Sequence, residues 1–164
     1  MSNLPKLVLV DTNVWLDYCL PMRPGHKTAL DMVGSCWRLG TQMLIAATST
    51  KDVFYVAAQT LKRQIAKGGS AVDAGTASAI NQIAWDLIEN INHVATPLGI
   101  DTGDLWLAQR HEAIHGDLED DLLIAAAQRA NVDFIVTNDR QLMIDSPVAA
   151  ITPMHLLDIL GQNA

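Results

Sequence analysis

The sequence has few of the residues that carry several common kinds of binding site. Its 164 residues include only two cysteines, Cys19 and Cys36, too few for a disulfide scaffold or a zinc site made of cysteines alone. Its eight aromatic residues are too few for an evident base-stacking platform. With 11 basic against 18 acidic residues and a net charge of −7, broad charge-driven coating of nucleic acid is disfavoured.

Long apolar runs are also missing. No run reaches the roughly 18 residues of a membrane-spanning helix, so we expect no contact with a membrane. The first run, Leu7–Val10, is too short for the core of a signal peptide, and a cytoplasmic location is the simple expectation. Hydrophobic residues make up 49% of the chain, enough for a core. We therefore predict one domain over residues 1–164, since this length is usual for a domain.

Short apolar runs alternate with helical patterns along the chain. Buried strands are predicted at Leu7–Val10, Met43–Ala47 and Phe134–Val136, with weaker strands at 93–97 and 148–152. Helices are predicted over 13–19, 26–39, 48–67, 71–92, 101–115, 118–130 and 155–160. This alternation predicts a layered α/β fold with a mostly parallel sheet.

Acidic residues follow the predicted strands or begin the predicted helices. Six fall at such places: Asp11, Asp52, Asp117, Asp120, Asp121 and Asp139. In open parallel sheets, ligands bind beyond the carboxyl ends of the strands, so these acids could meet at one edge. Crowded carboxylates repel one another and need a cation, and ligands that are all oxygen suit Mg²⁺ or Mn²⁺. Such a site can activate water and stabilise a phosphodiester transition state.

Each acid also has an ordinary structural explanation. Asp11 and Asp117 stand where helix caps are expected, and Ser49-x-x-Asp52 matches a capping box. Asn138-Asp139 is common turn chemistry. The joint placement of the acids, rather than any single one, favours a metal site.

Two longer motifs resemble those of PIN-domain nucleases. Leu7–Asp17 (LVLVDTNVWLD) is similar to the opening of these proteins. Glu119–Ala127 (EDDLLIAAA), followed by Phe134–Asp139 (FIVTND), is similar to their closing motifs. The resemblance covers nearly the whole chain. It implies a three-layer α/β/α sandwich with a short, mostly parallel sheet, and cleavage of RNA by water that Mg²⁺ or Mn²⁺ activates.

The resemblance assigns roles to the acids. Asp11 matches the family's first acid and Asp139 the acid after the fourth strand. The family's second acid is most often Glu. At this position the chain has Asp52, whose side chain is one methylene shorter. The acid of the later helix matches Asp120 in one subgroup and Asp121 in another. We take Asp11, Asp52, Asp120 and Asp139 as catalytic metal ligands, with Asp117 and Asp121 as further candidate ligands. Asn13 and Thr137 would be supporting or substrate-facing groups.

The resemblance also implies partners. Many family members are toxins that a small antitoxin protein silences, and many form homodimers. Residues 68–100 make this chain long for the toxin group, so the toxin role is one interpretation among others. Four basic residues of one helix could meet RNA phosphates or form a solvated face: Lys51, Lys62, Arg63 and Lys67. Three tryptophans could lie at a dimer interface, although core positions are the more usual expectation: Trp37, Trp85 and Trp106.

Two alternatives compete with this interpretation. His111-Glu112-Ala113-Ile114-His115 is an H-E-x-x-H motif, which on a helix holds zinc in peptidases. Gly116 breaks that helix at once, and no Glu follows Glu119 as the usual third ligand. The second alternative is a binding module that keeps the nuclease fold without turnover. Asp52 in place of the family's usual Glu is compatible with this alternative.

Overall fold

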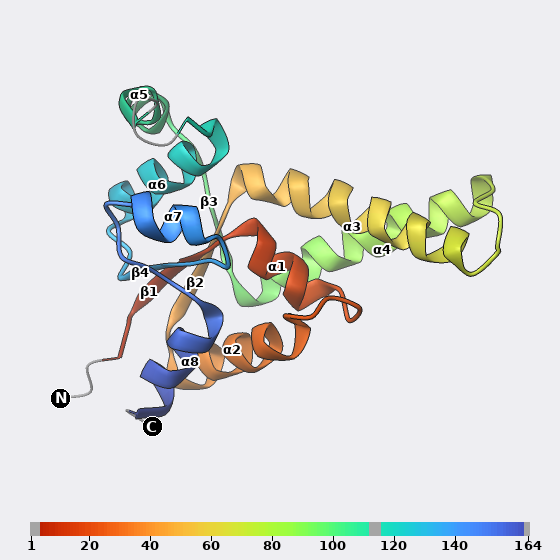
Figure 1. Cartoon of the computed structure of the whole chain (residues 1–164), viewed down its shortest axis with the longest axis horizontal. Helices are drawn as coiled ribbons and strands as arrows, with labels where there is room; N and C mark the ends of the chain where they lie inside the picture. Colours follow the sequence, from red (N-terminus) through yellow and green to blue (C-terminus); the bar gives the residue numbers. More distant parts are fainter. Residues whose placement is uncertain (1–3, 112–115, 163–164) are drawn as a thin grey trace.

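The computed structural model describes residues 4–111 and 116–162. Its strands are β1 (Leu7–Val10), β2 (Gln42–Ala46), β3 (Thr96–Leu98), β4 (Phe134–Val136) and β5 (Ala150–Ile151). Its helices are α1 (Thr12–Cys19), α2 (His26–Leu39), α3 (Ala47–Lys67), α4 (Ala74–Val94), α5 (Thr102–His111), α6 (Leu118–Ala130), α7 (Arg140–Asp145) and α8 (Pro153–Gln162). Most predicted elements are confirmed to within a few residues; the six-residue helix α7 was not predicted (Figure 1).

The strands form one sheet in the order β3-β2-β1-β4-β5, and every neighbouring pair is parallel. Alternate residues of β1 face opposite sides because side chains alternate along a strand. Val8 and Val10 pack in a core that α1, α2 and α8 cover, whereas Leu9 packs against α6 and α7. The predicted three-layer α/β/α arrangement is therefore confirmed, with a sheet that is parallel throughout.

The strand order reverses at β1. From β1 the chain adds β2 and β3 on one side, and it then adds β4 and β5 on the other. The backbone N–H of Asp11 donates to the carbonyl of Val136 at 2.9 Å, so the ends of β1 and β4 are held side by side. Residues that follow these two strands consequently share the edge at which α/β proteins bind ligands.

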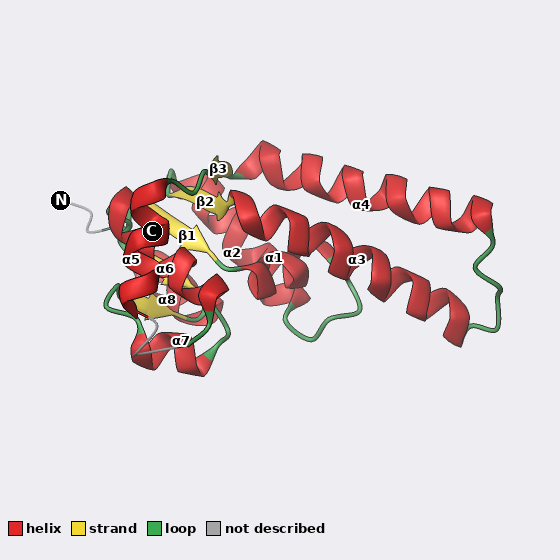
Figure 2. Ribbon diagram, turned by 90° about the horizontal axis from the view of Figure 1, so that it is seen from above, coloured by secondary structure: helices red, strands yellow, loops and turns green. Residues whose placement is uncertain are grey.

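Helices α3 and α4 form a hairpin that extends away from the sheet (Figure 2). Each has 21 residues, or about 30 Å of helix, and the hairpin has a small core of its own around Ala58, Ile80 and Ala84. None of the described helices is both long and apolar enough to cross a membrane. The sequence predicted both helices, but it did not predict that they project.

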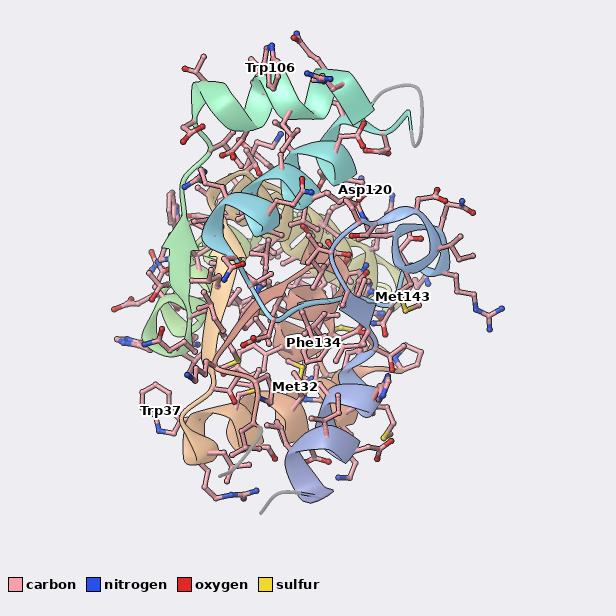
Figure 3. All side chains as sticks on the ribbon, turned by 90° about the vertical axis from the view of Figure 1, so that its left-hand side faces the viewer. Met32, Trp37, Trp106, Asp120, Phe134 and Met143 are labelled. Carbon is pink, nitrogen blue, oxygen red and sulfur yellow. The ribbon has the colours of Figure 1, made fainter. Side chains whose placement is uncertain are left out.

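The expectation of core positions for three of the tryptophans is wrong. Trp37 is 68%, Trp85 61% and Trp106 58% exposed, whereas Trp15 alone is fully buried. Trp37 on α2 and Trp106 on α5 lie at well-separated places on the surface (Figure 3). The exposed tryptophans therefore do not form one continuous apolar face.

Candidate active site

Asp11 is held rigidly at the end of β1. It caps α1, where its carboxylate accepts a hydrogen bond from the backbone N–H of Thr12 at 2.6 Å. The Thr137 hydroxyl donates to its other oxygen at 2.7 Å, and the Asn13 amide donates to that same oxygen. Burial raises the pKa of Asp11 above its ordinary value; these hydrogen bonds oppose the shift, and the charge of Asp139 adds to it.

Asn13 and Thr137 join the loops that follow β1 and β4. The Asn13 amide donates to the Thr137 hydroxyl at 3.2 Å, and Asn13 Oδ1 accepts from the backbone N–H of Asn138 at 3.1 Å. The Thr137 hydroxyl accepts from the backbone N–H of Asp139 at 2.9 Å. These contacts fix Asp11 and Asp139 relative to one another.

Asp139 caps α7. Its Oδ1 accepts from the backbone N–H groups of Gln141 at 2.7 Å and Leu142 at 3.1 Å. The same residue raises the pKa of Asp11 by charge repulsion, after the larger effect of burial. Asp139 thus both caps a helix and belongs to the acidic site, and the same is true of Asp11.

Glu119 also belongs to this acidic site, although the sequence did not predict it as a site residue. Its Oε1 lies 3.5 Å from the Thr12 hydroxyl, which donates to it. The pKa of Glu119 is raised by burial first and then by the charges of Asp52, Asp11 and Asp117. Glu119 therefore faces acids from β1 and α3 as well as its own helix cap. The sequence signal was its place beside Asp120 in the EDD run, but the run alone does not say which side of the helix faces Asp11.

Asp52 enters the site from α3. That helix begins at Ala47 and has no side-chain cap, so the capping box suggested by Ser49-x-x-Asp52 is not formed. Asp52 is half-buried and lies 3.4 Å from Lys51 Nζ. The charge of Asp52 helps to raise the pKa of Glu119, so Asp52 lies near the acidic site.

The three acids at the start of α6 lie in different surroundings. Asp117 caps the helix by accepting from the backbone N–H groups of Glu119 at 2.9 Å and Asp120 at 3.3 Å. Asp120 is half-buried at the N-terminal end of α6 (Figure 3), whereas Asp121 is 2% exposed. The charge of Asp11 also helps to raise the pKa of Glu119, after burial and the charge of Asp52.

The chemistry of this site suits a hard divalent cation. Its donors are carboxylate and hydroxyl oxygens, the ligands that Mg²⁺ and Mn²⁺ prefer. The repulsion that helps to raise the pKa values of Asp11 and Glu119 is relieved when a cation sits among them. Across residues 4–111 and 116–162, however, no three His, Cys, Asp or Glu side chains converge closely enough to form a ready-made metal site. The acids surround a common region without a formed coordination shell.

Residues 7–141 match the model of the PIN domain family. Because this match spans most of the chain, the protein belongs to the PIN domain family, as the sequence motifs indicated. No significant match was found among curated proteins.

Solved structures with the same fold come from bacteria and an archaeon. VapBC2 from Rickettsia felis, solved bound to a DNA fragment from their promoter, has a TM-score of 0.64 at 8% identity, covering 89% of this chain and 98% of that chain. Mycobacterium tuberculosis VapC20, a Sarcin-Ricin loop cleaving toxin, has a TM-score of 0.59 at 11% identity, covering 84% and 93%. PAE2754 from Pyrobaculum aerophilum has a TM-score of 0.59 at 16% identity, covering 96% and 91%. At these identities the likeness concerns the fold.

The zinc-site alternative falls at the end of α5. The helix ends at His111, and residues 112–115, which include Glu112 and His115, lie outside the described residues.

Proposed function

We propose that the protein is a metal-dependent endoribonuclease that hydrolyses RNA phosphodiester bonds. The observation that carries the proposal is the gathering of acids at the β1/β4 switch point of a PIN domain. The Thr137 hydroxyl joins Asp11 to the backbone of Asp139 there, and the Thr12 hydroxyl next to Asp11 donates to Glu119, whose pKa the charge of Asp52 helps to raise. These acids come from four separate segments of the chain, and such a concentration of negative charge needs a cation to receive a phosphodiester.

Asp11, Glu119, Asp120 and Asp139 would hold Mg²⁺ or Mn²⁺, with Asp52 beside them. The bound cation supplies an activated water and stabilises charge on the phosphate. Thr137 and Asn13 hold the Asp11 carboxylate in one orientation through hydrogen bonds. No side chain is needed as a nucleophile, because the attacking group is water.

We further propose that the protein is the toxin of a toxin–antitoxin pair that acts in the cytoplasm. The support is the fold shared with VapBC2 and with VapC20, which is described as a toxin. A small antitoxin protein and a second copy of the chain are the partners that this role implies. Exposed Trp106 offers apolar area for such contacts.

A binding module without turnover is the second candidate. Two observations favour it: Asp52 is shorter than the Glu that the resemblance leads us to expect, and the described acids do not form a closed metal-binding group. Such a module would bind RNA and leave it intact with either metal.

The test is cleavage of a single-stranded RNA by the purified protein with Mn²⁺, with Mg²⁺ and with EDTA. Asp11→Asn is compared with Asp86→Asn, a matched change on α4 where the carboxylate accepts from Gln82 at 2.9 Å. We expect cleavage that needs metal, is lost in Asp11→Asn and persists in Asp86→Asn. RNA that is bound but never cut would favour the binding module. One tightly held zinc that is lost in His111→Ala would favour the peptidase.

A further inference from the structure

Three of the eight aromatic side chains are gathered on the α3–α4 hairpin. The rings of Phe54 and Tyr55 have centroids 5.2 Å apart, and those of Phe54 and Trp85 are 5.0 Å apart. Phe54 is half-buried and packs against the hairpin core, whereas Tyr55 is 64% exposed. Phe54 therefore contacts two exposed rings, that of Tyr55 on α3 and that of Trp85 on α4.

Two cavities open beside these rings, and Tyr55 lines both. One, of about 360 Å³, lies between Lys51, Tyr55 and Trp85. The other, of about 700 Å³, is lined by Tyr55, Lys62 and the amide side chain of Asn81, among others. Both volumes lie in the range of roughly 300–1,000 Å³ that is usual for small-ligand sites. Each cavity combines an aromatic wall with a lysine.

This surface is continuous with the acidic site. Tyr55 follows Asp52 by three positions and Lys62 follows Tyr55 by seven, so helical periodicity puts all three on one face of α3. Lys51 joins the two regions, because it lines the smaller cavity and lies 3.4 Å from Asp52. A chain that passes Asp52 can therefore continue along Tyr55 toward Lys62.

The charge of α3 is opposite to that of the whole protein. The helix carries four of the chain's eleven Lys and Arg residues and a single acid, Asp52. The protein as a whole has a net charge of −7. A polyanion that approaches the acidic site is thus attracted along α3.

We propose that this face of the α3–α4 hairpin is a subsite for single-stranded RNA next to the cleaved phosphate. This inference rests on the proposed function and names where the substrate lies. Bases stack on Tyr55 and Trp85, and Lys51 and Lys62 neutralise the phosphates between them. Aromatic rings interleaved with lysines suit a single strand, because every base has a face that can stack.

A protein partner fits this surface less well. The cores of protein interfaces are depleted of charged residues, lysine among them. Here Lys51 and Lys62 border the cavities themselves. A partner protein is therefore an outcome of the test rather than the proposal.

The experiment measures binding of a fluorescein-labelled single-stranded RNA of about 12 nucleotides, a length suited to such platforms. It is done by anisotropy in EDTA so that metal-dependent hydrolysis cannot occur. We expect Tyr55→Ala and Trp85→Ala each to weaken binding about tenfold, the usual scale for loss of one stacked base. Tyr55→Phe keeps the ring and should bind like wild type. Trp37→Ala, an exposed tryptophan on α2 away from the hairpin, is the matched control.

The salt dependence of binding supplies a second readout. Lys62→Gln should reduce the slope of log affinity against log salt by about 0.7, the contribution of one phosphate contact in a single strand. Wild-type affinity in both Tyr55→Ala and Trp85→Ala would overturn the proposal. The proposal would also be overturned if Tyr55→Ala and Trp85→Ala changed only the oligomeric state of the protein, measured by analytical ultracentrifugation. That result would assign the surface to a protein interface. Because binding is measured in EDTA, its outcome is independent of whether the acidic site cleaves RNA.

Discussion

Thr137 and Asp11 meet side chain to side chain although 126 positions separate them in the sequence. The Thr137 hydroxyl donates to Asp11 Oδ2 at 2.7 Å and is fully buried. The Thr137 hydroxyl oxygen also accepts from the backbone N–H of Asp139 at 2.9 Å. One hydroxyl thereby ties the acid after β1 to the acid after β4, and the orientation of both depends on it.

Thr137→Val tests this link with a side chain of similar shape. It removes the donor to Asp11 and the acceptor for Asp139, which leaves a buried carboxylate and an amide each short of one partner. We expect a loss of about 1–3 kcal/mol in the free energy of unfolding and a further rise in the pKa of Asp11. Urea unfolding measures the first effect and carboxyl NMR titration the second. Thr137→Ser, which keeps the hydroxyl, should retain most of the stability; equal losses in both variants would contradict the role of the hydroxyl.

Glu119→Gln tests the repulsion among the acids. Because the folded-state pKa of Glu119 is raised above its ordinary value of 4.5, the folded protein binds its proton more tightly than the unfolded chain. Its stabilising contribution is present below that ordinary value and is lost as pH rises through the raised pKa. In metal-free protein at neutral pH, Glu119→Gln should therefore raise stability, by only about 0.5 kcal/mol because solvent screens the site.

The gain should disappear in acid, where Glu119 is already protonated. Glu89→Gln is the control, because Glu89 lies on α4 with only a 3.9 Å contact to His93, and it should give no such pH-dependent gain. Thermal unfolding across the acidic range measures both variants. A Glu119→Gln protein that is less stable than wild type at neutral pH would contradict mutual repulsion.

Asp120→Asn and Asp121→Asn form a matched pair on α6. Asp120 is half-buried at the helix end, whereas Asp121 lies in the interior at 2% exposed. We expect Asp120→Asn to fold with nearly wild-type stability and to lose metal-dependent cleavage. Asp121→Asn should lose about 1–3 kcal/mol of stability, the usual result of changing a buried polar group. If Asp121→Asn instead kept its stability and lost cleavage, while Asp120→Asn lost stability, Asp121 rather than Asp120 would be the metal ligand.

Gly25→Ala tests the support behind the site. A Cβ at Gly25 would lie 2.1 Å from Asp17 Oδ2, and Asp17 is buried. Its carboxylate accepts from Arg23 Nε at 2.6 Å and from the Asn138 side chain at 3.0 Å, so the added methyl must displace it.

The expected loss is about 1–3 kcal/mol in the free energy of unfolding, together with weaker binding of Mn²⁺ because Asn138 also contacts Asn13. Gly34→Ala is the control, since its Cβ would meet nothing within 4 Å. In the interior of α2 that change should stabilise by roughly 0.5–1 kcal/mol. Urea unfolding measures both; a neutral Gly25→Ala would show that Asp17 moves at little cost.

The sequence alone was sufficient to predict the layered fold and the places of Asp11 and Asp139. Buried strands such as Phe134–Val136 are continuous apolar runs, and an acid directly after such a strand must lie at the edge of the sheet. Helix α7 was missed because six residues are too few to display a helical period. In that case the cap at Asp139 was the only local signal.

Other features depend on tertiary contacts that no local pattern encodes. Glu119 lies beside Thr12, next to Asp11, because the first turn of α6 meets the start of α1. Tyr55 and Trp85 are exposed because α3 and α4 pack on each other beyond the edge of the sheet. An apolar side chain in a helical pattern ordinarily predicts a core position, and a projecting hairpin reverses that expectation.

The most direct measurement is the rate of cleavage of single-stranded RNA as Mn²⁺ is added back to EDTA-treated protein. Wild type, Asp11→Asn and Asp86→Asn are compared over the same metal concentrations. We expect rates that rise to saturation for wild type and Asp86→Asn, and a loss of roughly a hundredfold or more in Asp11→Asn. Cleavage that is indifferent to Mn²⁺, or an Asp11→Asn protein that cleaves at the wild-type rate, would contradict a metal-dependent ribonuclease site at the ends of β1 and β4.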